Sequence, residues 1–305
     1  MKRAILLTAA ISATLALSAC GASSDPTSTA GGGSTASSGS GAVVVGSANY
    51  EESVVLAAVY AQALKDKGVT VTMKNNIGAR DVYIKALQDG SIDVIPEFTG
   101  ALLSKLAGSN PNKDADSTYS ALQKALPADL TVLEKSAATS KDTVTITKAN
   151  ADKWGAKAIG DLVAHQSEIT FGGFSEFATK EPGLTTLKND YNFVPKGFQP
   201  FSSSTALAAA LKNGQVQAAD IFTSSSDQDP ATFVVLDDPK GSFGSQNVVP
   251  LLNKSKVTPT VTAALNAVSA KLTTDALVSM TKAYTVDHKD PSAVATDFLK
   301  SVGLS

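Results

Sequence analysis

Short apolar runs and longer segments with helical spacing alternate along the chain. The runs 42–46, 69–74 and 92–95 are typical of buried strands. Between them, residues 50–67 and 80–90 carry apolar side chains three and four positions apart, the spacing of one helix face. Strands that alternate with helices predict a parallel or mixed sheet with helices on its faces. Ligands of such sheets bind beyond the carboxyl ends of the strands.

The third of these strands leads into a segment with an unusual mixture of residue types. Pro96 has no N–H to donate, so we expect it to end the strand. A short turn would then present Glu97 and Phe98, and a helix would follow. The Thr99 hydroxyl can either cap that helix or bond a ligand. The sequence therefore predicts a corner at the sheet edge that can hold a small molecule.

The alternation resumes in the second part of the chain, which then finishes in helices. We expect strands at 130–136, 142–147, 167–173, 197–201, 216–222, 232–238 and 246–253, and helices at 204–214, 258–271, 273–285 and 291–302. This order predicts two lobes joined by two crossings, near residues 140–144 and 245–249. The first lobe would comprise residues 42–141 and 248–305, and the second residues 142–247.

The N-terminus has the features of an export signal. A basic start and a short uncharged stretch precede Cys20, and the stretch is shorter than the about 20 apolar residues of a membrane span. Cys20 is the only cysteine and has no internal disulfide partner. Residues 1–19 are either an ordinary signal peptide, with Cys20 incidental, or a lipoprotein signal. The stretch resembles the bacterial lipoprotein box, which implies acylation of Cys20 and a lipid anchor on the extracytoplasmic face of the cell membrane. Residues 20–41, small and polar, predict a flexible tether.

Several function classes lack support in the sequence. The chain has no HExxH, GxSxG or phosphate-binding loop and no Cys/His metal spacing, so we expect no enzyme, no metal site and no cofactor. His165 and His288 are expected to be exposed. Basic residues do not cluster and the net charge is −2, so nucleic acid is not an expected partner. A secreted hydrolase or an adhesion module on the same tether is the alternative from another class.

Four segments, in order, carry a resemblance that covers the chain after the tether. They read "VGSANYEESVVLAAVYAQAL", "ALQDGSIDVIPEFTGALL", "SEFATKEPGLTTLKNDYNF" and "ALKNGQVQAADIF…FVVLDDPKGSFGSQNVVPLL". The series resembles the substrate-binding proteins of ABC importers for osmoprotectants such as glycine betaine, carnitine or choline. The resemblance implies the type II periplasmic-binding-protein fold, an α/β fold in which two lobes joined by a two-strand hinge hold the ligand in the cleft. It also implies permease and ATPase subunits as partners.

In that family a cage of aromatic faces holds a quaternary ammonium group. Where the family commonly reads PEYTG, this chain keeps an aromatic face at Phe98 without the hydroxyl. Where it often reads NDTYAL, Asp142 is kept and Val144 replaces a cage tyrosine. At the second crossing Gln246 replaces another. Ala48 stands where relatives often carry lysine.

The remaining candidates follow strands in the second lobe. Glu176 and Lys180 match a family pattern that ends in arginine, and they are also spaced as an ordinary exposed helix pair. Phe222 follows a strand and is expected to face the cleft, while Tyr50 is expected to pack at its helix start. The ligand-binding candidates are Phe98, Thr99, Asp142, Val144, Glu176, Lys180, Phe222, Thr223, Ser224 and Gln246.

These departures leave two ligand classes open. The first is a quaternary ammonium osmoprotectant, the family's own ligand. The second is an uncharged, partly aromatic or hydroxylated molecule, because two aromatic walls and one cation of the family pattern are missing. If nothing compensates for the missing walls, glycine betaine and choline should bind weakly.

Overall fold

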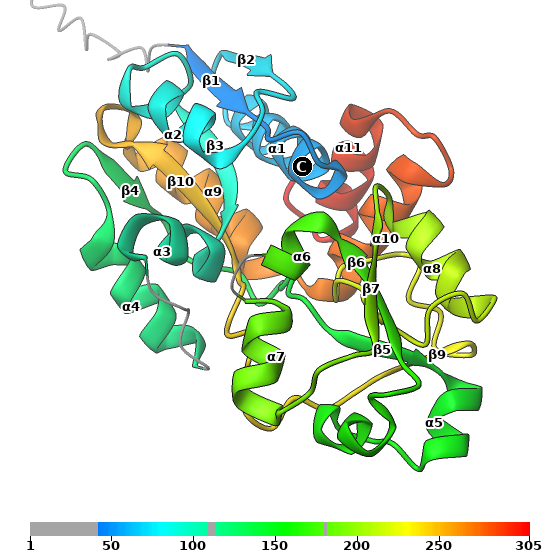
Figure 1. Cartoon of the computed structure of the whole chain (residues 1–305). Helices are drawn as coiled ribbons and strands as arrows, with labels where there is room; N and C mark the ends of the chain where they lie inside the picture. Colours follow the sequence, from blue (N-terminus) through cyan, green and yellow to red (C-terminus); the bar gives the residue numbers. More distant parts are fainter. Residues whose placement is uncertain (1–41, 109–113, 180–181) are drawn as a thin grey trace, which may run out of the picture. The chain divides into compact units, whose positions relative to one another are not determined.

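The computed structural model describes residues 42–108, 114–179 and 182–305 (Figure 1). These residues form two five-stranded mixed sheets with helices packed on them. Each sheet with its helices makes one lobe, as the alternation of strands and helices predicts. The expected signal peptide and tether, Cys20 and Lys180 lie outside the described residues.

The first sheet has the order β2-β1-β3-β10-β4. Its strands are β1 (Val43–Gly46), β2 (Val71–Lys74), β3 (Val94–Phe98), β4 (Leu130–Val132) and β10 (Val248–Asn253). β1 runs parallel to β2 and β3, and β10 is antiparallel to β3 and β4. The carboxyl ends of β1, β2 and β3 therefore share one edge, as in other α/β sheets that bind ligands.

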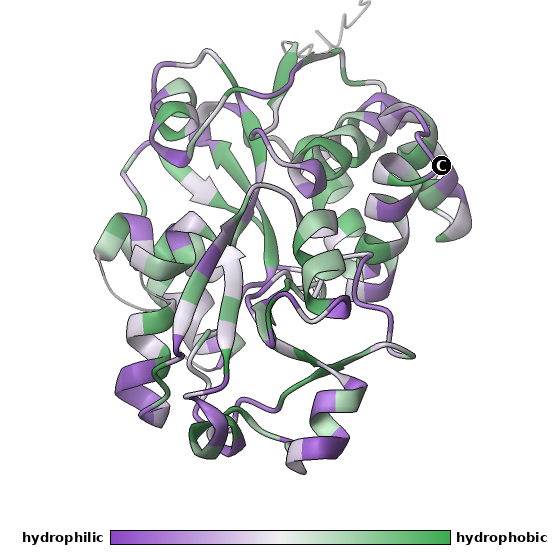
Figure 2. Ribbon diagram, turned by 45° about the vertical axis from the view of Figure 1, so that its right-hand side comes forward, coloured by the Kyte–Doolittle hydropathy of each residue, from purple (hydrophilic) through white to green (hydrophobic). Residues whose placement is uncertain are grey.

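Helices cover both faces of this sheet. They are α1 (Glu51–Asp66), α2 (Arg80–Gln88), α3 (Thr99–Ala107), α4 (Ala115–Ala125), α9 (Pro259–Lys271), α10 (Thr274–Thr285) and α11 (Pro291–Ser301), with the short η2 (Lys254–Lys256) after β10. Val248 and Leu252 of β10 pack with α1, α9, α10 and α11, whereas Val249 and Leu251 pack with α2, α3 and α4. This alternation is the period of a strand buried on both faces. Hydrophobic residues accordingly follow the strands of this sheet in Figure 2.

The second sheet has the order β7-β6-β8-β5-β9. Its strands are β5 (Val144–Thr147), β6 (Thr170–Phe174), β7 (Gly197–Phe201), β8 (Ala218–Asp220) and β9 (Phe233–Val235), and its helices are α5 (Lys148–Trp154), η1 (Ile159–His165), α6 (Ser175–Thr179), α7 (Leu184–Tyr191) and α8 (Ser204–Lys212). β6 is parallel to β7 and β8, while β5 is antiparallel to β8 and β9. One core joins the sheet to η1, α6 and α7, and a second joins it to α8.

One expectation about β3 is wrong. The strand continues through Pro96 to Phe98, so Glu97 and Phe98 belong to the strand and not to a turn. Pro96 lies opposite Pro250 of β10, and the Pro250 carbonyl accepts from Leu133 N at 3.0 Å on its other side. The two prolines therefore form one of the pairs of an antiparallel ladder that exchange no hydrogen bonds, so neither missing N–H removes a bond between β3 and β10.

The two crossings between the sheets run side by side. Thr139 and Asn247 form an antiparallel bridge, Val248 N donates to Ala138 O at 2.9 Å, and Ser140 N donates to Gln246 O at 3.2 Å. Each crossing is thus held by the other and not only by its own lobe. Within the described ranges, no helix is both long and apolar enough to cross a membrane.

Candidate functional site

Two aromatic side chains lie where strands of the first sheet end. Phe98 closes β3, and Tyr50 lies in the loop between β1 and α1. Their ring centroids are 6.3 Å apart with planes tilted by 31°. Phe98 is 8% exposed and also packs in the core, so it serves both the core and this edge. Burial raises the pKa of the Tyr50 hydroxyl.

Directly before Phe98, the fully buried Glu97 anchors this edge. Its Oε1 accepts from Arg80 Nε at 2.6 Å and from the Tyr83 hydroxyl, and its Oε2 accepts from Arg80 Nη2 at 3.2 Å. Phe98 N also donates to Glu97 Oε2 at 2.7 Å. Because every donor comes from the protein, Glu97 positions the strand end and is not a free ligand for a solute. The sequence pattern indicated Glu97 as a residue of this corner but did not indicate these partners.

A second aromatic pair lies at strand ends of the second sheet. Phe174 is the last residue of β6, and Phe222 follows β8. Their centroids are 6.1 Å apart with planes tilted by 37°, and both side chains are partly exposed. Sequence reasoning named Phe222 and missed Phe174. The signal was present, because Phe174 ends an apolar run just as Phe98 does.

Next to this pair, two carboxyl groups approach each other. Asp220 ends β8 and is 1% exposed, and the half-buried Asp142 precedes β5. They lie close enough for one carboxyl group to donate a hydrogen bond to the other when it holds a proton. Burial raises the pKa of Asp142 to about 6, and burial together with the Asp142 charge raises the pKa of Asp220 well above its usual range. Asp142 was predicted from sequence as a site residue, whereas Asp220 was not.

Ser224 links the two lobes. Its hydroxyl donates to Glu52 Oε1 on α1 at 2.9 Å and lies 2.6 Å from the Ser140 hydroxyl on the first crossing. Burial raises the pKa of Glu52. Since Glu52 follows Tyr50 by two residues and Ser224 follows Phe222 by two, this bond brings the chain segments that carry the two aromatic pairs close together.

Thr223 fastens the same loop to the first crossing. Its Oγ1 donates to Thr139 O at 3.2 Å and accepts from Lys141 N at 3.1 Å, while Thr223 N donates to Lys141 O at 3.0 Å. The Thr223 hydroxyl therefore both donates and accepts a hydrogen bond within the protein. Thr223 and Ser224 thus lie where the loop after β8 meets the crossing, and their contacts are structural in this state.

Thr99 and Gln246 make the corresponding contacts at the second crossing. Asn247 N donates to Thr99 Oγ1 at 3.0 Å, and Thr99 N donates to Asn247 O at 2.9 Å. Of the two roles left open for the Thr99 hydroxyl, capping of α3 is not observed, because α3 has no side-chain cap at its N-cap position. Instead, Gln246 Oε1 accepts from Ala101 N at 2.8 Å and satisfies one of the free N–H groups of the first turn.

The side chains of the other candidates make no hydrogen bond or ring contact with the aromatic pairs among the described residues, although the Val144 backbone lies opposite Asp220 in the β5–β8 ladder. Val144 is fully buried in the core of the second sheet and presents no surface. Glu176 is exposed on α6, and its expected partner Lys180 is outside the described residues. Ala48 is buried in the first lobe. His165, expected to be exposed, is instead half-buried and stacks on Trp154 with centroids 5.2 Å apart, while His288 is exposed.

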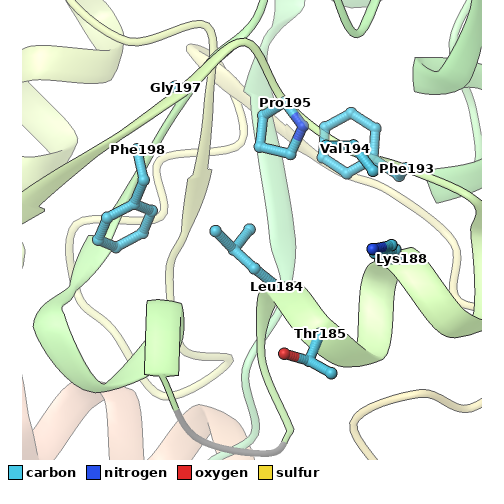
Figure 3. Close-up of a pocket in the computed structure, with 8 residues that line it drawn as sticks. All are labelled: Leu184, Thr185, Lys188, Phe193, Val194, Pro195, Gly197 and Phe198. Atoms are coloured by element: carbon cyan, nitrogen blue, oxygen red, sulfur yellow. The ribbon is translucent and has the colours of Figure 1, made fainter.

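Two cavities among the described residues lie elsewhere. Figure 3 shows one of about 330 Å³ between α7 and β7, lined by Leu184, Thr185, Lys188, Phe193, Val194, Pro195, Gly197 and Phe198. Another, of about 580 Å³, lies among α9, α10 and α11. Neither includes a candidate residue. In the part of the chain that the structure describes, no group of three or more histidine, cysteine or acidic side chains is placed to hold a metal ion.

Comparison with curated proteins gives distant relatives along most of the chain. The ergothioneine transport permease/ergothioneine binding protein EgtU of Helicobacter pylori is 22% identical over 267 residues, which cover 86% of this chain and 48% of that protein. The chain thus matches about half the length of this relative. The glycine betaine-binding protein YehZ of Escherichia coli is 25% identical over 277 residues, covering 86% of this chain and 90% of that protein.

Solved structures show the same fold. A glycine betaine/carnitine/choline ABC transporter structure superposes with a TM-score of 0.76 at 19% identity, over 86% of this chain and 99% of that one. The structure of apo YehZ from Escherichia coli gives a TM-score of 0.69 at 21% identity, with the same coverage. The expected two-lobed α/β binding-protein fold is therefore confirmed.

The family is settled by a match along residues 41–301 to the model described as the substrate-binding domain of ABC-type glycine betaine transport systems. This match confirms the resemblance seen in the sequence. It also confirms that the chain is a solute-binding protein and not an enzyme, since the family captures solutes for transport. The chain belongs to the family of substrate-binding domains of ABC-type glycine betaine transport systems.

Proposed function

We propose that this chain is the extracytoplasmic receptor of an ABC importer and captures a small organic cation with a methylated ammonium group. The observation that carries this proposal is the presence of two aromatic pairs, one at the strand ends of each sheet. Tyr50 and Phe98 belong to the first lobe, and Phe174 and Phe222 to the second. The Ser224–Glu52 bond joins the segments that hold them.

Aromatic faces suit such a ligand for a physical reason. A methylated ammonium group cannot donate a strong hydrogen bond, so the negative face of a ring is its best neutral partner. Each contact contributes from about 0.5 to 2 kcal/mol, more when water is excluded. With Phe174 and Tyr50 included, the chain offers four rings, which can compensate for the two aromatic walls that the sequence comparison finds missing.

The relatives supply the choice of probes. EgtU is named for ergothioneine and YehZ for glycine betaine, and one similar structure is named for glycine betaine, carnitine and choline. We propose that the solute of this chain shares the methylated ammonium group of these compounds.

An uncharged ligand is the second candidate. It is favoured by Val144 and Gln246, two residues that are not aromatic and that stand at cage positions of the family. It is also favoured by Arg80, because Glu97 neutralises the charge that Arg80 could otherwise offer to a carboxylate of the ligand. Such a ligand would use the same rings through apolar contact alone.

The proposed mechanism is capture by closure of two lobes. Residues 42–141 and 248–305 would move as one body and residues 142–247 as the other, about the paired crossings. A ligand that contacts both lobes stabilises the closed state by its preference for that state. The closed receptor would then deliver its solute to the permease, driven by the ATPase subunits.

Calorimetry distinguishes the two ligand classes. The probes are choline, glycine betaine, carnitine, ergothioneine and 3,3-dimethyl-1-butanol, an uncharged carbon analogue of choline. We expect choline to bind about 10-fold or more tightly than the analogue, since one or two cation–π contacts separate them. Equal or tighter binding of the analogue would favour the uncharged ligand, and no binding to any probe would contradict a methylated ammonium solute.

We further propose that Cys20 is acylated after removal of residues 1–19, so that residues 20–41 tether the receptor to the membrane. A Cys20→Ser variant should then leave the membrane fraction or fail to mature, while the wild type stays in it. Wild-type protein found without lipid and cleaved at another site would contradict the anchor.

A further inference from the structure

The carboxyl pair Asp142–Asp220 has no role in the account so far. It lies where the first crossing enters the second lobe, with Asp220 at the carboxyl end of β8. Of the two oxygens of Asp220, Oδ1 is buried without a hydrogen-bond partner among the described residues, although Thr143 N bonds the carboxyl group. A buried acceptor without a donor is costly unless something supplies a proton.

Among the described residues, no cationic side chain forms an ion pair with either carboxyl group. Charged side chains on neighbouring segments include Lys141, Lys148, Lys212, Glu52, Glu176 and Asp227. A proton held between the two carboxyl groups is therefore the group that gives Asp220 its missing hydrogen bond, as in other acid pairs that share one site.

The pair lies directly beside the second aromatic pair. A Cβ atom added to Gly173 would lie 3.5 Å from Asp220 Cβ, and Phe174 is the next residue along β6. Phe222 follows Asp220 by two residues. A charge on the pair is thus separated from both rings by only one or two residues along the chain, and it lies beside the buried Asp220, where charge is screened weakly.

We propose that Asp142 and Asp220 together carry one negative charge at neutral pH, which strengthens the binding of a cationic solute at the Phe174–Phe222 pair, and that a second proton abolishes this gain in acid. The charge acts through its field, so the carboxyl groups need not touch the solute. This inference rests on the proposed function and explains why the receptor would prefer a cationic solute to an uncharged one.

The protonation behaviour of the pair supports the proposed pH range. Burial raises the pKa of Asp142 to about 6 and raises that of Asp220 well above its usual range, so a pair that shares one proton takes up its second proton as the pH falls through about 6. Its net charge then changes from minus one to zero as the pH falls through that value. Affinity for a cation should fall in the same range, and affinity for an uncharged molecule should not.

The test is calorimetry of the purified chain with choline between pH 7.5 and pH 5.0. For the wild type we expect choline to bind about 5- to 10-fold more weakly at pH 5.0, the range that linkage to one proton allows. Asp142→Asn should bind choline weakly and equally at both pH values. Asp227→Asn, in the loop after β8, is the matched control and should keep the pH dependence. Binding of 3,3-dimethyl-1-butanol should be independent of pH.

Two results would overturn the inference. Choline that binds the wild type equally at both pH values would contradict it and leave the receptor function intact. Failure of choline to bind at any pH would contradict it as well. Calorimetry with the other probes named above then decides separately whether the receptor binds an uncharged solute. If Asp142→Asn does not fold, carboxyl carbon shifts of ¹³C-aspartate in the wild type test the shared proton directly. Two carboxyl groups that both titrate near pH 4 would rule it out.

Discussion

At the scale of single residues, Glu97 determines the stability of the first lobe's strand ends. It is fully buried and accepts four hydrogen bonds, two of them from Arg80. Glu97→Gln leaves the Arg80 charge without its partner, so we expect the free energy of unfolding to fall by about 3 kcal/mol in urea denaturation. The control Glu176→Gln, on an exposed face of α6, should change it by less than about 0.5 kcal/mol. Equal effects of the two substitutions would contradict this role.

Also at this scale, Phe174 tests whether the second aromatic pair binds the solute. Phe174→Leu keeps apolar bulk and removes the ring face, so choline affinity should fall about 5- to 30-fold, which corresponds to 1–2 kcal/mol. Phe298→Leu, on α11 of the first lobe, is the matched control and should leave affinity unchanged. If both variants bind choline like the wild type, the ring faces of Phe174 and Phe222 are not part of the site.

At the scale of elements, Thr99 joins α3 to the second crossing. Its hydroxyl is the acceptor for the buried Asn247 N–H. Thr99→Val keeps the shape but leaves that N–H unpaired, and we expect a loss of about 1–3 kcal/mol in the free energy of unfolding. Thr72→Val, on the exposed face of edge strand β2, should be neutral or slightly stabilising. A neutral Thr99→Val would show that the crossing does not depend on this bond.

Elements were the part of the fold that the sequence predicted best. The expected helix at 50–67 is α1 (Glu51–Asp66), and the expected strand at 197–201 is β7, because apolar periodicity is a local property of the chain. The continuation of β3 through Pro96 was not predictable in this way. It depends on Pro250, a residue far along the chain whose register only the folded sheet defines.

The candidate site was predicted less completely, again for physical reasons. Strand ends indicated Phe98 and Phe222 correctly as edge residues, but the alignment-based choice of Val144 selected a side chain that points into the core. Three further residues become site candidates only through contacts with other segments. These are Asp220 beside Asp142, Glu52 bonded to Ser224, and Phe174 beside Phe222. No spacing within one segment encodes those contacts.

At the scale of the whole molecule, buried acids should make stability depend on pH. The pKa of Asp142 in the folded chain is about 6, above the value of about 4 expected when unfolded. Its contribution is therefore fully present below about pH 4 and is lost as the pH rises through about 6. Relative to Asp142→Asn, the wild type should lose about 1 kcal/mol of unfolding free energy between pH 5 and pH 7.5 in urea denaturation. A constant difference between the two proteins would contradict a raised pKa.

The central claim is that the two lobes capture a cationic solute between their aromatic pairs, and a crystal structure of the choline complex tests it most directly. The account predicts that the ammonium group lies within about 6 Å of rings from both pairs, Tyr50–Phe98 and Phe174–Phe222. A choline molecule bound in the cavity of Figure 3, or one that contacts residues of only one lobe, would contradict it.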